Sequence, residues 1–332
     1  MSEISIIIPA HNSEETIENC INSILLATKN VVSEIIVVDD NSTDNTSKIV
    51  NNFKEIKLTK LKINSGAGAA RNAGADLAKY KILCFVDSDI VIAKDSIQIL
   101  LSRLIKDTDT GAVLATQRVV NLNKTDWTSN FVCLKSCYGF ESTQPDIEFS
   151  ACCSEFCVIS KELFNKTGKW KTLRNAGGEE FDMGLKINNL NKKNIKLKSA
   201  SYEAHYQSLY KRFINIVDRT EKYLPTFFKK KKFDSLGSFA TFNQAFSSLI
   251  TLFYILLTIL IIILNKTYII TSLLIILFVI QLIIEFRFLV FSKKYFGIKM
   301  MLFSIFGIQI INLGIFFGFI YFIINKINVF KK

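Results

Sequence analysis

Two aspartates one residue apart follow an apolar run in the first third of the chain. Residues 82–86 are apolar, and Asp87 and Asp89 come directly after them. If the run is a strand, side chains two positions apart point to the same side, so the two carboxylates lie together. Neighbouring carboxylates repel unless a positive charge lies between them. The simplest candidate for that charge is a hard divalent cation, Mg²⁺ or Mn²⁺, shared with a substrate phosphate. By itself the motif is a weak signal, because Asp-x-Asp is common in ordinary turns, and the rest of the chain has to decide.

Three more groups of polar or glycine residues follow predicted elements upstream: residues 9–12, Asp39-Asp40 and the glycine-rich segment 66–72. Ligands of open α/β sheets bind at the carboxyl ends of the strands. The apolar runs predict strands at 4–8, 34–38, 58–63, 82–86 and 112–120, an apolar segment at 149–159, and short edge strands at 195–197 and 201–204. Helices are expected between the strands, for example at 14–27 and 96–106. This alternation predicts an α/β fold with a doubly wound, mostly parallel sheet.

At this point the chain resembles family-2 glycosyltransferases, which have the Rossmann-like GT-A fold. Five motifs carry the resemblance in the family's order: Ile6–Glu14, Val37–Asp44, Asn64–Gly74, Asp87-Ser88-Asp89 and Gly178–Met183. It covers about residues 3–215, and a membrane tail is a known variation on the family. The resemblance implies an inverting enzyme that transfers a sugar from a nucleoside-diphosphate donor.

The same resemblance implies which residues hold the nucleotide. Asp40 would accept a hydrogen bond from the base, Arg71 would hold the nucleotide with its donor fork, and Gly66 would permit close approach of the backbone. His11 stands where the family commonly has tyrosine and would stack on the base. The nucleotide-binding set is Pro9, Ala10, His11, Asn12, Glu14, Asp40, Gly66, Arg71, Asn72, Asp87 and Ser88.

The metal and the catalytic base are implied in the same way. Asp89 would bind Mn²⁺ or Mg²⁺, Asp87 would touch the ribose or a metal-bound water, and His205 would approach the metal or the diphosphate. An inverting transfer needs a base within hydrogen-bond reach of the acceptor hydroxyl. The family usually has Glu-Asp where this chain has Glu179-Glu180, so Glu180 aligns with the base, and Glu179 and Asp182 stay open as alternatives.

Charge and cysteine content restrict the partners and the compartment. The net charge is +12, and residues 186–232 contain thirteen Lys or Arg against three acids. Because this basic segment leads into apolar helices, we expect an anionic membrane surface or a lipid phosphate as its partner, and no nucleic acid. The seven cysteines are odd in number, which argues against a disulfide framework and favours free thiols.

The last hundred residues are dominated by Ile, Leu and Phe. Apolar spans are expected at about 240–264, 268–291 and 300–324, each long enough for a hydrocarbon core about 30 Å thick. Lys229–Lys232 and Lys293, Lys294 and Lys299 place the ends of these spans in the cytoplasm. The carboxyl terminus would then lie outside. Lys326, Lys331 and Lys332 conflict with this placement, because positive residues are normally found on the cytoplasmic side. An amphipathic helix from residue 208 onward is expected at the membrane interface or packed on the domain.

These features predict three parts: a GT-A catalytic domain at 1–206, a basic interface segment at 207–235 and a transmembrane region at 236–332. With no signal peptide visible, the catalytic domain is expected on the cytosolic side of the plasma membrane. It would transfer a sugar, from a UDP-sugar, to a lipid-linked or membrane-proximal glycan acceptor of the cell envelope. Two rivals remain: a processive polysaccharide synthase of the same fold, although residues 207–213 lack its Gln-x-x-Arg-Trp pattern, and a catalytically silent membrane scaffold or transport component.

Overall fold

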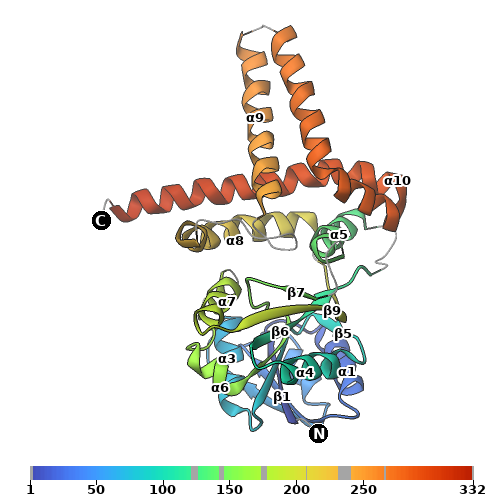
Figure 1. Ribbon diagram of the computed structural model, residues 1–332, viewed down its shortest axis with the longest axis vertical. Helices are drawn as coiled ribbons and strands as arrows, with labels where there is room; N and C mark the ends of the chain where they lie inside the picture. Colours follow the sequence, from blue (N-terminus) through green and yellow to red (C-terminus); the bar gives the residue numbers. More distant parts are fainter. Residues whose placement is uncertain are drawn as a thin grey trace. The chain divides into compact units, whose positions relative to one another are not determined.

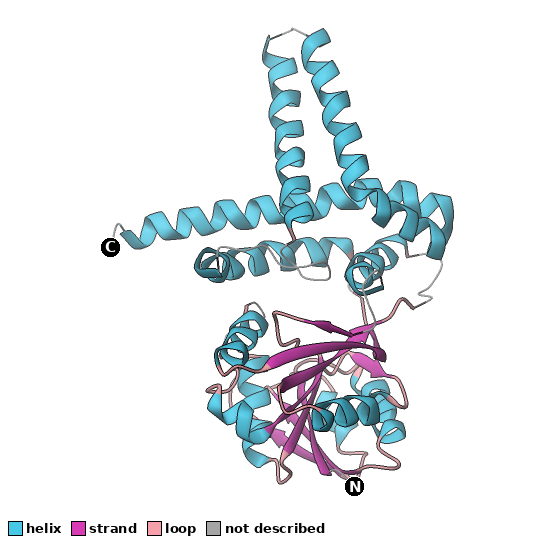
Figure 2. Ribbon diagram, viewed as in Figure 1, coloured by secondary structure: helices cyan, strands magenta, loops and turns pink. Residues whose placement is uncertain are grey.

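The computed structural model describes residues 3–120, 126–141, 146–172, 178–206, 208–230, 241–264 and 267–330. The chain divides into two compact units. The first contains residues 1–118 and 143–205, and the second contains residues 119–142 and 206–332. Figure 1 labels the elements of both units, and Figure 2 colours them by type. The chain therefore passes between the units three times.

One sheet organises the first unit. Its strands are β1 (Glu3–Ala10), β2 (Val32–Asp39), β3 (Ile56–Lys60), β4 (Ile82–Val86), β5 (Ile90–Ile92), β6 (Thr110–Gln117), β7 (Asp146–Glu148), β8 (Phe156–Ser160) and β9 (Lys193–Ala204). They run in the order β3-β2-β1-β4-β8-β6-β9-β5, with β7 paired to β9. Four neighbouring pairs are parallel (β1 with β2 and β4, β2 with β3, β6 with β9), and β8, β5 and β7 run antiparallel to their partners.

The sheet is thus mixed, and the expectation of a mostly parallel sheet holds only for its β3-β2-β1-β4 half. The expectation of two edge strands at 195–197 and 201–204 was wrong, because both lie in the single strand β9, between β6 and β5. Register shifts against β6 accompany Lys198 to Ala200. The sequence pattern is interrupted at the same residues, which is why it predicted two short strands.

Helices cover both faces of the sheet, as the apolar runs require. They are α1 (Ile17–Ala27), α2 (Thr46–Val50), α3 (Ala67–Leu77), α4 (Ser96–Lys106), α6 (Lys161–Lys166) and α7 (Glu179–Asn189). The apolar side of α1 and α4 joins the core made by Ile4, Ile6 and Ile8 of β1 and their neighbours. Because α3 is rich in small residues, Gly74 lies directly on β1 and β2; a Cβ there would come within 2.4 Å of Ile7. The packed sheet holds the strand ends, and so the site, in place.

Four helices of the second unit are α5 (Trp127–Glu141), α8 (Leu209–Lys230), α9 (Phe242–Leu264) and α10 (Thr267–Phe330). Two helical stretches, Phe242–Ile261 and Ile270–Asn325, are long and apolar enough to cross a membrane. The second and third predicted spans both lie in α10, which is interrupted between them by the non-helical Gly297. Three distinct crossings were expected, and the described part of the chain supports two candidate helices.

Candidate active site

The end of β2 holds the glycine-rich segment in place. The carboxylate of Asp40 accepts hydrogen bonds from the backbone N–H groups of Ser65 (2.8 Å) and Gly66 (2.7 Å). Gly66 has φ 88° and caps α3, a left-handed conformation that favours glycine. The backbone N–H of Asp40 donates to Ala10 O, 2.8 Å away, and joins β2 to β1. Asp40 therefore lies at the predicted pocket, with both carboxylate oxygens bonded to the loop that precedes α3.

Its neighbour Asp39 is fully buried and was not among the predicted site residues. It accepts hydrogen bonds from Ser42 N (2.7 Å) and from the Ser47 hydroxyl, and Lys60 Nζ lies 3.5 Å away. Burial alone would raise the pKa of Asp39, but these hydrogen bonds and Lys60 lower it below its usual value. Asp39 thus holds the turn that follows β2.

We expect Asp39→Asn to reduce the free energy of unfolding by about 1–3 kcal/mol at pH 7, because buried donors lose a charged acceptor. A carboxyl group with a lowered native pKa stabilises the fold above its unfolded pKa, and this contribution is lost as the pH falls through the native pKa. The difference from wild type should therefore shrink below about pH 4. Urea denaturation at several pH values measures it, with the exposed Asp109→Asn as control. A difference independent of pH would contradict this role.

The first predicted motif forms a hydrogen-bonded junction with the turn after β2. Pro9 and Ala10 are the buried last residues of β1. The side chain of Asn12 accepts from Thr43 N (2.9 Å), and that of Glu14 accepts from Asn45 N (3.0 Å). His11 is exposed, and its Nε2 lies 2.9 Å from Asn64 Nδ2. Glu14 and Asn12 thus hold loops together, while His11 keeps an exposed ring beside the glycine-rich segment.

A buried arginine joins the sequence motifs electrostatically. The side chain of Arg71 in α3 is 3% exposed, and its Nη2 donates to Asp87 Oδ1, 2.5 Å away. Burial acts to lower the pKa of Arg71, but Asp87, Glu179 and Glu180 outweigh it and raise the pKa. Among the described residues, the buried Nε and Nη1 atoms of Arg71 have no hydrogen-bond partner. Because buried donors are normally satisfied, these two atoms indicate room for an anionic ligand beside Asp87.

The Asp-x-Asp pair lies where β4 ends. Asp87 is partly exposed, and its backbone N–H donates to Glu155 O, 2.9 Å away. Ser88 is buried, with its hydroxyl 2.8 Å from that of Ser13. Asp89 is exposed at the surface but lies in a crowded site, where desolvation and then the charges of Asp87 and Glu155 raise its pKa to about 7. A crowded, strongly anionic environment of this kind favours binding of a cation.

His205 follows β9 and comes to this point through the sheet. Ile90 pairs with Ala204 in β5 and β9, and the His205 N–H donates to Asp89 O, 2.8 Å away. The side chain of His205 is exposed. The structure therefore brings His205 next to Asp89 in the backbone, although more than one hundred residues separate them.

The acids of α7 differ sharply in their surroundings. Glu179 and Glu180 are 6% and 5% exposed. Glu180 Oε1 accepts from the Ser154 hydroxyl at 3.4 Å, and Glu180 O accepts from Cys152 N at 2.9 Å. Asp182, by contrast, is 35% exposed and pairs with Lys186 on the same helix, 2.7 Å away. Glu179 and Glu180 thus belong to the buried charge cluster around Arg71, and Asp182 has a separate ion pair.

Asn72, predicted to bind the nucleotide, makes two hydrogen bonds to Trp170. Its amide donates to Trp170 O (2.9 Å) and accepts from Trp170 N (3.0 Å). These two hydrogen bonds to the backbone of one residue fix the segment after α6 against α3. Trp170 in turn lies beneath Arg71, whose guanidinium carbon is 5.7 Å from the indole ring centre. Asn72 therefore positions Trp170 and, through it, Arg71.

Glu155 is the charged neighbour of the Asp-x-Asp pair that sequence reasoning missed. Its carbonyl accepts from Asp87 N, and its carboxylate accepts from the hydroxyl of the buried Tyr202. A lone glutamate before a strand carries no motif. Only the antiparallel pairing of β8 with β4, which places Phe156 opposite Val86, reveals its position.

The donor set at this edge of the sheet fits a divalent cation completed by a ligand. Asp87 and Asp89 supply carboxylate oxygens, which Mg²⁺ and Mn²⁺ prefer. Within the described residues no three His, Cys, Asp or Glu side chains are arranged to hold a metal ion by themselves. The unpartnered N–H groups of Arg71 lie next to Asp87. An anionic ligand that brings its own oxygens would satisfy both the cation and Arg71.

Comparison with known proteins assigns the region that contains these strand ends to a family. Residues 5–168 match the family model described as "Glycosyl transferase family 2". The chain belongs to this family. The matched region contains β1 to β8 and therefore Asp40, Arg71, Asp87 and Asp89. The prediction of a family-2 glycosyltransferase is thus confirmed.

Individual relatives of this glycosyltransferase share parts of its length. It is 26% identical over 179 residues to a poly-beta-1,6-N-acetyl-D-glucosamine synthase of Staphylococcus epidermidis, covering 51% of this chain and 42% of the synthase. It is 42% identical over 92 residues to an Escherichia coli UDP-Glc:alpha-D-GlcNAc-diphosphoundecaprenol beta-1,3-glucosyltransferase, covering 27% of this chain and 36% of that enzyme. The chain spans less than half the length of these relatives.

A solved structure agrees with the fold. A mannosyltransferase from Pyrobaculum calidifontis, in complex with GDP-Man and Mn²⁺, superposes with a TM-score of 0.50 at 18% identity. The match covers 68% of this chain and 64% of that one. The mixed α/β domain of the first unit therefore has the architecture of GT-A glycosyltransferases.

Proposed function

We propose that this chain is an inverting glycosyltransferase that moves a sugar from a UDP-sugar to a lipid-linked or membrane-proximal glycan acceptor. The observation that carries the proposal is the buried Arg71, which has two unpartnered N–H groups between the Asp-x-Asp end of β4 and the acids of α7. A diphosphate at this point would accept from Arg71 and lie beside Asp87 and Asp89. The glucosyltransferase relative, whose name includes UDP-Glc and a diphosphoundecaprenol acceptor, supports the donor and acceptor classes.

Each group of residues has one task in this proposal. Asp40 orders the loop before α3 against the base, and Arg71 holds the diphosphate with its donor fork. Asp89 and Asp87 hold Mn²⁺ or Mg²⁺, and His205 lies next to them. The cation, when bound, supplies Lewis-acid stabilisation of the departing nucleoside diphosphate. Glu180 takes the proton of the acceptor hydroxyl on the other side of the sugar, and its burial keeps water from that step.

The membrane part of the proposal rests on α9 and α10. Both are long and apolar enough to span a bilayer, and the basic residues before α9 and between the apolar parts of α10 support a cytosolic position for these ends. The catalytic domain, the basic interface segment and the membrane region would then be three functional parts of one chain. Tethering raises the effective concentration of a membrane-bound acceptor.

Titration of the full chain with UDP, with and without Mn²⁺, tests the donor site. We expect UDP to bind more tightly with Mn²⁺, and Asp89→Asn to lose this metal-dependent gain because it removes one of two carboxylate ligands. Calorimetry measures both affinities, and Asp109→Asn, an exposed acid outside the site, is the matched control. If UDP and other nucleoside diphosphates all fail to bind, the transferase proposal is wrong and the silent scaffold takes its place.

The similarity to the poly-N-acetylglucosamine synthase favours a second candidate, a processive synthase of the same fold. Membranes containing the chain, incubated with a panel of nucleotide sugars, distinguish the two. Release of nucleoside diphosphate identifies the donor, and the length of the product identifies the mode. One sugar added per acceptor supports the single-transfer enzyme, and a long homopolymer supports the synthase.

A further inference from the structure

One residue divides the longest helix of the chain into two parts. Gly297 of α10 has φ 80° and ψ −178°, which is not helical. We call residues 298–330, after this break, the C-terminal arm. In Figure 1 the arm runs across the pair formed by α9 and the first part of α10, instead of alongside it. The sequence alone predicted that this arm crosses the membrane a third time.

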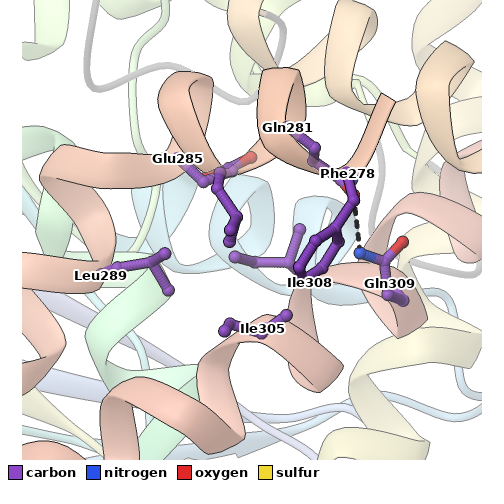
Figure 3. A pocket seen from close by; sticks show the side chains of 8 residues that line it. Phe278, Gln281, Glu285, Leu289, Ile305, Ile308 and Gln309 are labelled. Carbon is purple, nitrogen blue, oxygen red and sulfur yellow. Dashed lines mark hydrogen bonds between the residues drawn. The ribbon is translucent and has the colours of Figure 1, made fainter. Parts of the chain in front are cut away.

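Hydrogen bonds between polar side chains join α9 and the arm within one short stretch of each helix. Thr251 donates to Gln309 Oε1 (2.9 Å), and Gln244 donates to Asn312 Oδ1 (2.8 Å). The arm also contacts the first part of α10, where Gln309 donates to Gln281 Oε1 (2.8 Å). This bond lies beside a cavity that Figure 3 shows. The α9 residues in these bonds, Gln244 and Thr251, lie in the first half of the helix. An arm crossing the bilayer next to α9 would make such contacts along its whole length.

The arm instead packs along α8 through two glycines. A Cβ at Gly318 would lie 2.6 Å from Val217 O, and one at Gly314 would lie 3.1 Å from Ile216. Further contacts continue along both helices: Phe213 faces Phe317, Phe228 stacks on Phe322, and Asn325 donates to Glu221 at 2.8 Å. Only glycine permits this approach at residue 318, so the two helices form one pair.

The partner helix α8 is too highly charged for a hydrocarbon core. Among the described side chains of α8, six are charged: Lys211, Arg212, Asp218, Arg219, Glu221 and Lys222. Each charge at the centre of a bilayer costs about 3 kcal/mol or more. The helix α8 must therefore lie at the water boundary, and the arm, which packs against it, lies there too.

The elbow at Gly297 has the same environment. Lys293, Lys294 and Lys299 around it are exposed. Just before the elbow, the buried Glu285 pairs with Lys135 of α5 at 3.1 Å. Positively charged, water-exposed residues mark the cytosolic end of a membrane segment. We therefore expect the chain to leave the membrane at this elbow.

Apolar side chains remain exposed on the arm away from the two glycines. Leu302, Phe306, Phe317, Ile320 and Ile324 recur at helical spacing and are 37–58% exposed. On a helical projection of 100° per residue, these five positions fall on one side, and Gly314 and Gly318 fall on a neighbouring side. Ile298, Phe319, Tyr321 and Ile323 are exposed as well and extend this apolar stripe to other sides of the arm, while α8 covers its glycine side.

We propose that the arm lies in the plane of the cytosolic leaflet, with its apolar stripe against the acyl chains and α8 on its glycine side. The carboxyl terminus is then cytosolic, and the chain crosses the membrane twice. This proposal rests on the membrane association proposed above. It also removes the conflict noted for Lys326, Lys331 and Lys332, because positive residues belong on the cytosolic side.

Cysteine labelling of the full chain in intact cells tests the proposal. The seven native cysteines are buried, so the wild-type chain is the background control. With a membrane-impermeant maleimide, we expect Tyr268→Cys, at the exposed start of α10, to be labelled from outside. Lys332→Cys and the elbow variant Lys294→Cys should be labelled only after permeabilisation.

The other outcomes separate the proposals. Labelling of Lys332→Cys from outside, at the level of Tyr268→Cys, would overturn the in-plane arm and restore three crossings. Failure to label Tyr268→Cys from outside, with labelling after permeabilisation, would overturn the membrane hairpin and with it the arm. Neither result touches the transferase proposal, because labelling does not depend on nucleotide binding or sugar transfer.

Discussion

Glu180→Gln is expected to abolish sugar transfer while nucleotide binding stays at the wild-type level. The amide keeps the shape of the side chain and its contact with Ser154, but it cannot accept the proton of the acceptor hydroxyl. Loss of a general base lowers the turnover number by about 10²–10⁴-fold. Release of nucleoside diphosphate from the donor sugar measures turnover, and UDP calorimetry on the same protein measures binding.

Two matched variants decide which acid of α7 is the base. Asp182→Asn breaks a half-exposed pair with Lys186 and should leave turnover near that of wild type. Glu179→Gln removes charge near Arg71 and should change UDP affinity more than turnover. Normal turnover in Glu180→Gln, together with a collapse in either other variant, would move the base to that residue.

Arg71→Met is the second change with a large expected effect, on both stability and donor binding. It leaves Asp87, Glu179 and Glu180 without the buried cation among them. We expect the free energy of unfolding to fall by about 2–4 kcal/mol, less than for a pair buried at both ends because Asp87 is 23% exposed. UDP binding should be lost as well, since the donor fork for the diphosphate is gone. Urea denaturation and calorimetry measure the two effects.

Arg71→Lys and Arg118→Met serve as controls. Lysine keeps the charge but not the fork, so it should retain most of the stability and still bind UDP weakly. Arg118 pairs with Glu203 at the surface, with side chains 49% and 35% exposed, and its loss should cost under about 1 kcal/mol. If Arg71→Met binds UDP like wild type, the unpartnered N–H groups of Arg71 do not face the donor.

The residues at the strand ends show which parts of the site could be predicted from the sequence. Asp40, Arg71, Asp87 and Glu180 were each named from motifs, and the structure places them around one edge of the sheet. Asn72 and Glu14 were named by the same motifs, yet their side chains bond to Trp170 and Asn45. A motif fixes which residue types stand at a turn, but the atoms each one contacts depend on loops distant in sequence.

Motif spacing and apolar periodicity are local properties of the chain. They were therefore enough to predict the family, the alternation of strands and helices, and the two acidic motifs, Asp87-Ser88-Asp89 and Glu179-Glu180. The mixed sheet, in which β9 lies between β6 and β5, and the position of Glu155 beside the Asp-x-Asp pair became visible only in the tertiary structure. Those depend on strand pairing across more than sixty residues, which local patterns do not encode. The tertiary structure likewise decided that the third apolar span packs against α8, since hydropathy measures the composition of a helix and not its neighbours.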